Sequence, residues 1–472
     1  MLQNCPRACF PPCISYHLPG RTVLHTDFCA GKAACTWIGD IFMNSVDTTG
    51  PVLRRNSCCQ QEAPQSGNHD IPSGWKQILD LDFIYKWATL LILPAYAITT
   101  GIRSQIFVIY VILFVLKVRK SGYVKCGLEY YFAIAMLGLA VSFIGVWDAK
   151  ILKNVIQVAK ILCLPILMCQ YKPIRKIEND LALIFAGLGV YGLARMLFAP
   201  LVTGYALDRP YCYSDFFMHS SVIAFSGYLF FLVSFVRREG YGWKLFSAVN
   251  VLIFAYLILL HSVRASYLAF LILTPVILLF EFKRMAFISM ACLLVCGAAI
   301  AGGLCMFRPE IATKTGAKIR SIVDNSNGSN RGRVVFWKRA IQVFSENPVN
   351  GIGYRRFNRR YVDARSAEFD WAFWHAHSEF FSMLAETGLI GVIAWFAFKI
   401  RLLVLFFRER RHWIGAFMLY LFLAFEIHNF FECYLYERNA YIYIYVLLGL
   451  GINQIVRKRG ASTCSAECES IA

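Results

Sequence analysis

From about residue 82 to residue 455 the sequence consists largely of apolar segments, each about as long as a helix that crosses a bilayer. Over the whole chain 58% of the residues are hydrophobic and 16% are charged, whereas roughly a quarter of the residues in a soluble domain are charged. The sequence therefore predicts an all-α integral membrane protein. We expect about twelve membrane helices, at residues 82–100, 104–117, 129–147, 152–170, 181–201, 219–236, 244–262, 265–282, 286–307, 388–407, 413–431 and 439–455.

The first eighty residues differ from the rest of the chain. They have no apolar run behind a basic start, which excludes an ordinary secretory signal peptide, and their composition follows no helical or strand period. We expect residues 1–80 to form a disordered cytoplasmic extension, or to precede a later start of the working protein at Met43 or beyond.

One long polar interval interrupts the apolar segments late in the chain. It divides the expected protein into helices one to nine in 81–307, a loop domain in 308–387, helices ten to twelve in 388–456, and a cytoplasmic tail in 457–472. Since only the loop domain is long and polar enough to form a sizeable hydrophilic structure, we expect the chemistry there.

Positive charges between the helices predict the orientation. Eighteen Lys or Arg lie in the tail and in the loops after helices two, four, six, eight and ten, whereas the other short loops hold six. Because cytoplasmic loops collect Lys and Arg, both termini are expected in the cytoplasm and the loop domain on the opposite face. This use of charge accounts for much of the net charge of +19 without nucleic acid.

The loop domain is itself basic, with thirteen Lys or Arg between residues 308 and 386. An anionic partner would explain this excess, because a guanidinium group binds phosphate through two parallel hydrogen bonds. The alternative is a basic surface that faces solvent or lipid headgroups, above all along Arg355 to Arg365.

Two further arginines fall on the same predicted face. Arg264 lies between two apolar segments with almost no loop, so its charge is expected at or just inside the membrane interface, where it is costly without a partner. It either binds an anion or extends to lipid headgroups. Arg209 follows the fifth helix and either serves the same face or pairs with its neighbour Asp208. Three separate parts of the chain are thus expected to meet on one surface.

His377 is the candidate for acid–base chemistry. It is expected to open a short helix, since Phe380, Phe381 and Leu384 follow at the spacing of an apolar stripe. A histidine ordinarily has a pKa of about 6.5, which suits it to take a proton from a hydroxyl at neutral pH. His375 and His377 could instead bind metal, but side chains two apart on a helix diverge and no neighbouring ligands complete a set. A purely structural histidine is the third alternative.

Arg331 to Trp337 predict the start of an amphipathic helix. It is expected to end near Asn347 to Gly353, where a proline and two glycines force a turn. On spacing alone this is a structural connection.

Taken together, these features resemble the O-antigen ligase family of the bacterial lipopolysaccharide pathway, which shares its signature with O-antigen polymerases and some protein O-oligosaccharyltransferases. Arg209 stands where the ligases place an outward arginine. The other residues that carry the resemblance are His377-Ser378 with Gly388 eleven residues after the histidine, Arg264 with Leu268 at the turn of a helix pair, and the helix and turn of 331–353.

The resemblance implies an activity and a location. Such enzymes move a glycan from undecaprenyl pyrophosphate to an acceptor hydroxyl on the periplasmic face of the bacterial inner membrane. For a ligase, the acceptor is a sugar of the lipid A core. The expected partners are this donor, this acceptor and membrane lipids. No metal and no other cofactor are expected, because fixed arginines can stabilise the charge that develops on the pyrophosphate.

The resemblance also implies roles for individual residues. Arg209 and Arg264 would stabilise the leaving pyrophosphate, and His377 would activate the acceptor hydroxyl for an inverting attack on the anomeric carbon. Five further residues are expected either to contact substrate or to shape the loop: Arg331, Arg333, Ser378, His375 and Tyr354.

Two other functions stay open. An O-antigen polymerase, which extends a lipid-linked glycan, has motifs that this sequence does not separate from those of a ligase. A transporter or channel would bury charged residues within its helices or show inverted repeats. Here the charges are expected at the helix ends, so we favour the ligase over the transporter.

Overall fold

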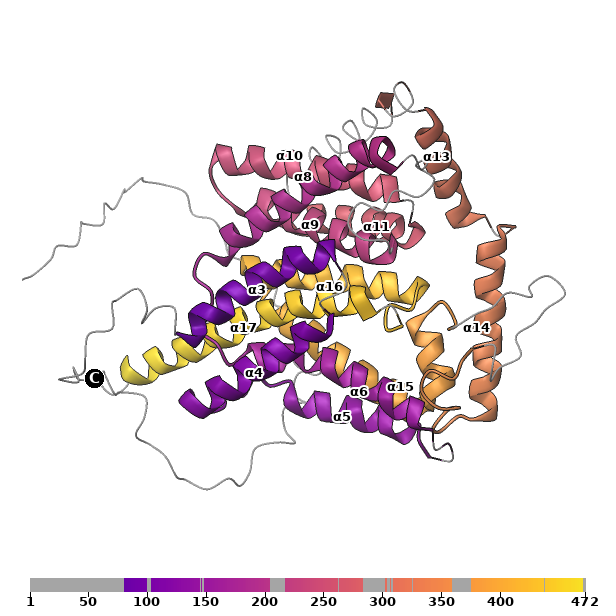
Figure 1. The fold of residues 1–472 in the computed structure, drawn as a ribbon, viewed down its shortest axis with the longest axis horizontal. Coiled ribbons are helices and arrows are strands. Elements are labelled where there is room, and N and C mark those ends of the chain that lie inside the picture. Colours follow the sequence, from indigo (N-terminus) through magenta and orange to yellow (C-terminus); the bar gives the residue numbers. More distant parts are fainter. Residues whose placement is uncertain are drawn as a thin grey trace, which may run out of the picture. The chain divides into compact units, whose positions relative to one another are not determined.

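Figure 1 shows a computed structural model of the chain, in which every secondary-structure element of the described residues is a helix. The expected all-α class is therefore confirmed for this part of the chain. All described residues belong to one compact unit, Asn68–Ala472, and residues 1–79 lie outside them. The structure describes residues 80–99, 103–144, 146, 148–203, 217–261, 263–282, 302–303, 306, 309–324, 326–358, 375–436 and 438–469.

The helices keep the labels of Figure 1. They are α3 (Leu81–Ile98), α4 (Arg103–Ser121), α5 (Glu129–Val141), α6 (Ala149–Leu162), α7 (Leu164–Met168), α8 (Ile177–Thr203), α9 (Phe217–Arg237), α10 (Tyr241–His261), α11 (Arg264–Phe282), α13 (Pro309–Val323), α14 (Gly328–Glu346), α15 (Glu379–Arg408), α16 (Trp413–Phe431) and α17 (Arg438–Glu469).

Within the described residues, nine helical segments are long and apolar enough to cross a membrane. Helix α4 is not one of the nine and carries basic residues at both ends, and α5, with 13 residues, is shorter than a crossing. The expected helix at 286–307 lies almost entirely outside the described residues. The count of twelve therefore stays a prediction.

The helices pack around α9, which is buried along most of its length. It contacts α10, α11 and α16, and polar side chains in these contacts are paired between helices. The Ser221 and Ser266 hydroxyl oxygens lie 2.5 Å apart, and Tyr228 Oη lies 2.9 Å from Thr274 Oγ1. Such pairing satisfies hydroxyls that would be costly to bury alone in an apolar body.

One sequence expectation about the charges is wrong. Lys399 lies deep in the second half of α15, with its side chain 4% exposed, and pairs with Glu379 and Glu426. The expected restriction of charges to helix ends fails because three charged groups that are distant in sequence compensate one another inside the body.

The loop domain begins with helices that run across the bundle. Figure 1 shows α14 lying crosswise to α16 and α17. The amphipathic helix predicted from Arg331 is confirmed, since α14 spans Gly328–Glu346 and Asn347 caps its carboxyl end. A small apolar core forms where Phe336, Ala340 and Val343 of α14 pack against the start of α15. This core places α14 beside the histidine segment.

Helix α15 is broken inside its sequence. Gly388 has φ 63° and ψ −165°, which are not helical values, so Glu379 to Thr387 form a first half and Leu389 to Arg408 a second. The predicted helix at 388–407 corresponds to the second half. The break lets the turn that follows α14 pair with the opened backbone: Gly353 N donates to Glu386 O at 2.9 Å.

Glycines permit this pairing because the two backbones nearly touch. A Cβ at Gly388 would lie 2.5 Å from the carbonyl carbon of Val349, and one at Gly351 would lie 2.3 Å from that of Glu386. Both glycines also have positive φ, which side chains other than hydrogen disfavour. Gly388 and the Asn347 to Gly353 turn are thus two halves of one structural joint.

Candidate active site

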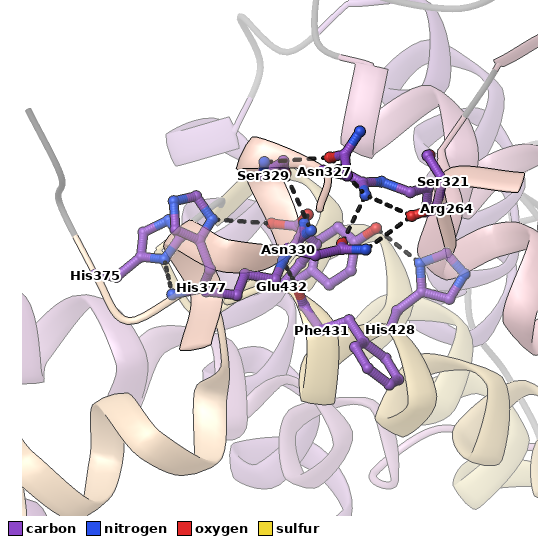
Figure 2. Close-up of polar contacts among 12 residues, drawn as sticks. Arg264, Ser321, Asn327, Ser329, Asn330, His375, His377, His428, Phe431 and Glu432 are labelled. Carbon is purple, nitrogen blue, oxygen red and sulfur yellow. Dashed lines mark hydrogen bonds and ion pairs between the residues drawn. The ribbon is translucent and has the colours of Figure 1, made fainter. Parts of the chain in front are cut away.

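Arg264 begins α11 directly after the tight turn from α10. Its Nη1 donates to Asn330 Oδ1 at 2.6 Å and to Ser321 O at 3.2 Å, and lies 3.4 Å from Asn327 Oδ1 (Figure 2). These acceptors lie where α13 ends and α14 begins. Arg264 therefore ties the membrane body to the start of α14.

The rest of the Arg264 guanidinium stays available. No residue in the described part of the chain accepts a hydrogen bond from its Nε or Nη2. The residue is partly buried. A guanidinium that is fixed through one nitrogen presents the other two to an anion in a defined direction.

Arg333 of α14 is satisfied in a different way. Its Nε donates to Phe431 O at 3.2 Å, its Nη1 donates to Ser329 Oγ at 3.2 Å, and its Nη2 pairs with Glu432 Oε1. All three nitrogens have protein partners and the charge is balanced by a carboxylate. Arg333 therefore holds the end of α16 against α14.

Glu432 directly follows α16 and joins Arg333 to His377. Its Oε1 pairs with Arg333, and its Oε2 lies 3.4 Å from His377 Nδ1. Burial raises the pKa of Glu432, but the hydrogen bond from His377 and the charge of Arg333 outweigh burial and hold it below the ordinary value. The carboxylate is thus ionised at neutral pH. Figure 2 shows Glu432 between the histidines and Arg264.

His377 lies two residues before α15, so the expectation that it opens the helix is wrong. Its φ of 50° is left-handed, and the extended Ser378 separates it from the helix. This backbone allows the ring to reach Glu432 and to stack on Phe336, with the centroids 5.8 Å apart. The side chain is 36% exposed. The ring is therefore held on one face and accessible elsewhere.

His375 is buried beside His377 and shapes its turn. Its Nδ1 accepts a hydrogen bond from the backbone N–H of His377 at 3.0 Å, and its ring packs against Tyr436. Burial, aided by the charge of His377, lowers the pKa of His375 to about 3. His375 is therefore neutral across the physiological range.

The geometry of the two histidines revises one argument against a metal. Since both precede the helix, helical divergence does not separate them, and their ring centroids lie 4.5 Å apart. Even so, no group of three or more His, Cys, Asp or Glu in the described residues is arranged to hold a metal ion.

Three other residues predicted to contact substrate differ in how far they are buried. Ser378 is fully buried, and its Oγ has no hydrogen-bond partner among the described residues. Tyr354 is also buried, and its backbone N–H lies 3.3 Å from Ser142 Oγ. Arg331 is exposed on α14. Arg331 alone of these three has a side chain at the surface.

The predicted basic run from Arg355 is in part structural. Arg355 lies over the ring of Tyr436, 4.3 Å from its centroid, and Arg356 pairs with Asp148 at 3.3 Å. The rest of the run, residues 359–365, lies outside the described residues, as does Arg209. Their predicted roles stay untested.

The sequence interpretation missed two residues of this site. Asn330 bonds Arg264, and Glu432 links Arg333 to His377. Glu432 lies in a short loop on the predicted outward face, where several arginines are also expected. An acid in that position could have indicated an ion pair with one of them. We call Arg264, Arg333, Glu432 and His377 the histidine cluster.

The fold and the histidine cluster define a multi-pass helical membrane protein with an arginine–carboxylate–histidine site formed by α11, α14, the segment before α15 and the end of α16. The model of the O-antigen ligase family matches residues 248–396, which include Arg264, Arg333 and His377, and this match supports that family. It implies a glycosyltransferase-like membrane enzyme of the ligase or polymerase type in lipopolysaccharide biosynthesis, with lipid-linked glycans as substrates. No curated protein matches the chain.

Proposed function

We propose that this protein is an O-antigen ligase, which transfers a glycan from undecaprenyl pyrophosphate to a sugar hydroxyl of the lipid A core. The proposed location is the bacterial inner membrane, with both termini cytoplasmic and the histidine cluster periplasmic. The observation that carries the proposal is a partly exposed histidine whose Nδ1 faces an ionised carboxylate, close to an arginine that keeps two nitrogens available.

His377 acts as the general base. With Nδ1–H directed at Glu432, its Nε2 carries the lone pair that takes the proton of the acceptor hydroxyl. The acceptor oxygen then forms a bond to the anomeric carbon, and the bond from that carbon to the pyrophosphate oxygen breaks with its electron pair. A single displacement of this kind inverts the anomeric configuration.

Glu432 and Arg333 support this step. Glu432 selects the tautomer and orientation of His377 and stabilises the imidazolium that forms. Arg333 holds Glu432 through the ion pair and the Phe431 carbonyl. We therefore propose that Arg333 positions the base, although the sequence had suggested a substrate contact.

Arg264 stabilises the leaving pyrophosphate through Nε and Nη2, and Arg209 is proposed to assist it. The pyrophosphate is a good leaving group, so fixed positive charge is sufficient and the reaction is proposed to be metal-independent. Arg331 is a proposed substrate contact, whereas Ser378, which is fully buried, is proposed to shape the loop. His375 and Tyr354, both buried, shape the walls of the site.

Two alternatives remain in competition. An O-antigen polymerase would use the same groups with a lipid-linked glycan as acceptor. The buried Lys399 with Glu379 and Glu426 removes the sequence argument against a transporter. Uptake by reconstituted vesicles without sugar transfer would favour a transporter, and a gene deletion that leaves a single repeat on the lipid A core would favour a polymerase.

The test is transfer by the purified protein in detergent. Undecaprenyl-pyrophosphate glycan and rough lipopolysaccharide are supplied with excess chelator, and His377→Ala is compared with His412→Ala, a change in the exposed turn between α15 and α16. The proposal expects transfer by the wild type and by His412→Ala but not by His377→Ala. Lengthening of the lipid-linked glycan without product on lipopolysaccharide would identify a polymerase instead.

A further inference from the structure

A buried lysine pairs with the first residue of α15, the helix that follows His377. Lys399 Nζ pairs with Glu379 Oε1 and lies 2.7 Å from Glu426 Oε2. Trp395 Nε1 also donates to Glu379 Oε1, at 2.6 Å. The side chains of Lys399 and Glu379 are 4% and 3% exposed. We call Glu379, Lys399 and Glu426 the lysine bridge.

The first arm of the bridge exists because α15 is broken. In a continuous helix, residues 379 and 399 would lie about 30 Å apart along the axis. The break at Gly388 turns the first half of α15 back so that Glu379 meets Lys399 of the second half. Since Glu379 comes two residues after His377, this arm fixes the segment that presents the proposed base.

The second arm reaches another helix. Glu426 belongs to α16, which ends at Phe431 immediately before Glu432. Lys399 therefore connects the start of α15, which positions His377, to the helix that positions Glu432. Through the two arms, Lys399 is connected to both partners of the contact between His377 Nδ1 and Glu432 Oε2.

Stabilising the membrane helices through the lysine bridge requires three charged groups to be removed from water, which costs free energy. Replacing buried ion pairs by well-packed apolar residues of similar volume is often neutral or stabilising, and charges inside membrane helices usually serve a function. We propose that Lys399 is a positioning residue which, through Glu379 and Glu426, holds His377 and Glu432 at the separation that glycan transfer requires. This inference rests on the proposed function of the histidine cluster.

The geometry explains why such a device would matter. At 3.4 Å the contact between His377 Nδ1 and Glu432 Oε2 is long, so a further small displacement abolishes it. A misplacement of about 1 Å costs on the order of a hundredfold in rate. Arg264 begins a different helix, α11, and among the described residues its side chain bonds only to the junction of α13 and α14. Loss of the bridge should therefore affect turnover more than donor binding.

The main test removes all three charges together. In Glu379→Gln/Lys399→Met/Glu426→Gln, the side chains keep similar sizes and no buried charge is left unpaired. We expect a donor KM close to that of the wild type and a kcat lower by about tenfold to a hundredfold. Lys399→Arg, which can also bridge two carboxylates, should keep most of the rate.

The pH profile provides a second readout. Besides His377, Arg333 and His375 face the Glu432 carboxylate. The base His377 must be neutral to act, and the Glu432 carboxylate favours its imidazolium form, so separating the two should move the acid limb of the kcat profile to lower pH in the triple variant. A role of the bridge in folding alone would not move it.

A matched control removes another buried pair far from the site. Lys117 and Asp82 pair at 2.8 Å between α3 and α4, and Asp82→Asn/Lys117→Met should leave kcat and the pH profile unchanged. The inference is overturned if the triple variant folds and keeps the wild-type kcat and profile, or if only its donor KM rises. If the triple variant does not fold, Glu426→Gln alone is judged by the same outcomes.

The proposed function and the proposed role of the lysine bridge are rejected by different results. A wild type that transfers no glycan rejects the function. In that case ¹⁵N NMR of the His377 imidazole still tests the bridge, because the variant should lose the spectral signature of the Glu432 contact without any turnover. An unchanged His377 signal in the variant would reject the bridge.

Discussion

The histidine cluster and the lysine bridge combine cations with carboxylates in the same protein, yet they differ in what is left exposed. In the cluster, His377 is 36% exposed and Arg264 keeps two nitrogens without a described partner. In the bridge, Lys399 is 4% exposed and pairs on two sides. Charged side chains with unpaired, accessible hydrogen-bonding atoms can contact a substrate. Buried charged side chains that pair with one another can only position their neighbours.

This difference predicts opposite mutational patterns. Changes in the exposed members of the cluster should remove activity and leave stability nearly intact, because exposed side chains contribute little to folding. Changes to single members of the bridge should reduce stability, because they leave a buried charge unpaired.

The largest expected effect is on His377. His377→Ala should lower kcat by about 100-fold to 10,000-fold, because the general base is lost, with a thermal midpoint close to that of the wild type. Transfer assays and thermal unfolding in the same detergent measure both quantities. A protein that loses its thermal stability together with its activity would place His377 among the structural residues and break the comparison.

Lys399→Met, in contrast, should mainly reduce the stability of the protein. With the cation gone, Glu379 and Glu426 face each other in a buried environment, and we expect a loss of about 3 kcal/mol in the free energy of unfolding. Denaturant titration in detergent measures this loss. Lys86→Met removes the partner of Asp180 in a more exposed pair and should cost less than about 1 kcal/mol. Equal losses of unfolding free energy in Lys399→Met and Lys86→Met would show that burial does not increase the contribution of the lysine bridge to stability.

Arg264→Lys is expected to lower kcat by roughly tenfold to a hundredfold with little change in stability. A lysine keeps the charge but cannot bind Asn330 and Ser321 through one nitrogen while offering two others to an anion. Steady-state transfer kinetics make the measurement, with Arg401→Lys on the exposed face of α15 as the control. Wild-type turnover in Arg264→Lys would mean that only charge is needed there.

The smallest expected effect concerns His375. Its pKa is lowered to about 3 in the folded protein, against 6.5 ordinarily, so the unfolded chain binds the extra proton between these values. Stability should therefore fall as pH decreases through this window, by on the order of 1 kcal/mol at pH 5.5. His375→Gln should flatten this part of the stability profile. A slope equal to that of the wild type would mean that His375 is not the group responsible.

Much of the fold followed from hydrophobic segments alone. Their length predicted helices close to α3, α8, α9, α10, α11 and α16, because a bilayer crossing imposes a narrow range of lengths. Segment length began a helix at Gly388, directly after Glu386 and Thr387, but could not predict how the backbone turns there. The break depends on the turn after α14, which is distant in sequence.

The candidate site was predictable where a residue type carries its own chemistry. Arg264 and His377 stood out because a charge at a tight turn and a histidine in a polar loop need an explanation. The predicted roles of these residues stay predictions. Glu432 and Lys399 were missed because their significance lies in pairs formed between helices, and hydrophobic periodicity contains no information about which helices meet.

The central claim is that His377 and Glu432 act as one unit, and a double-mutant cycle on kcat tests it most directly. Glu432→Gln should slow glycan transfer in the wild-type background, and should have little further effect in His377→Ala, because the carboxylate then has no base to orient. If Glu432→Gln slows transfer by the same factor in both backgrounds, the two residues act independently and the proposed arrangement of the base is wrong.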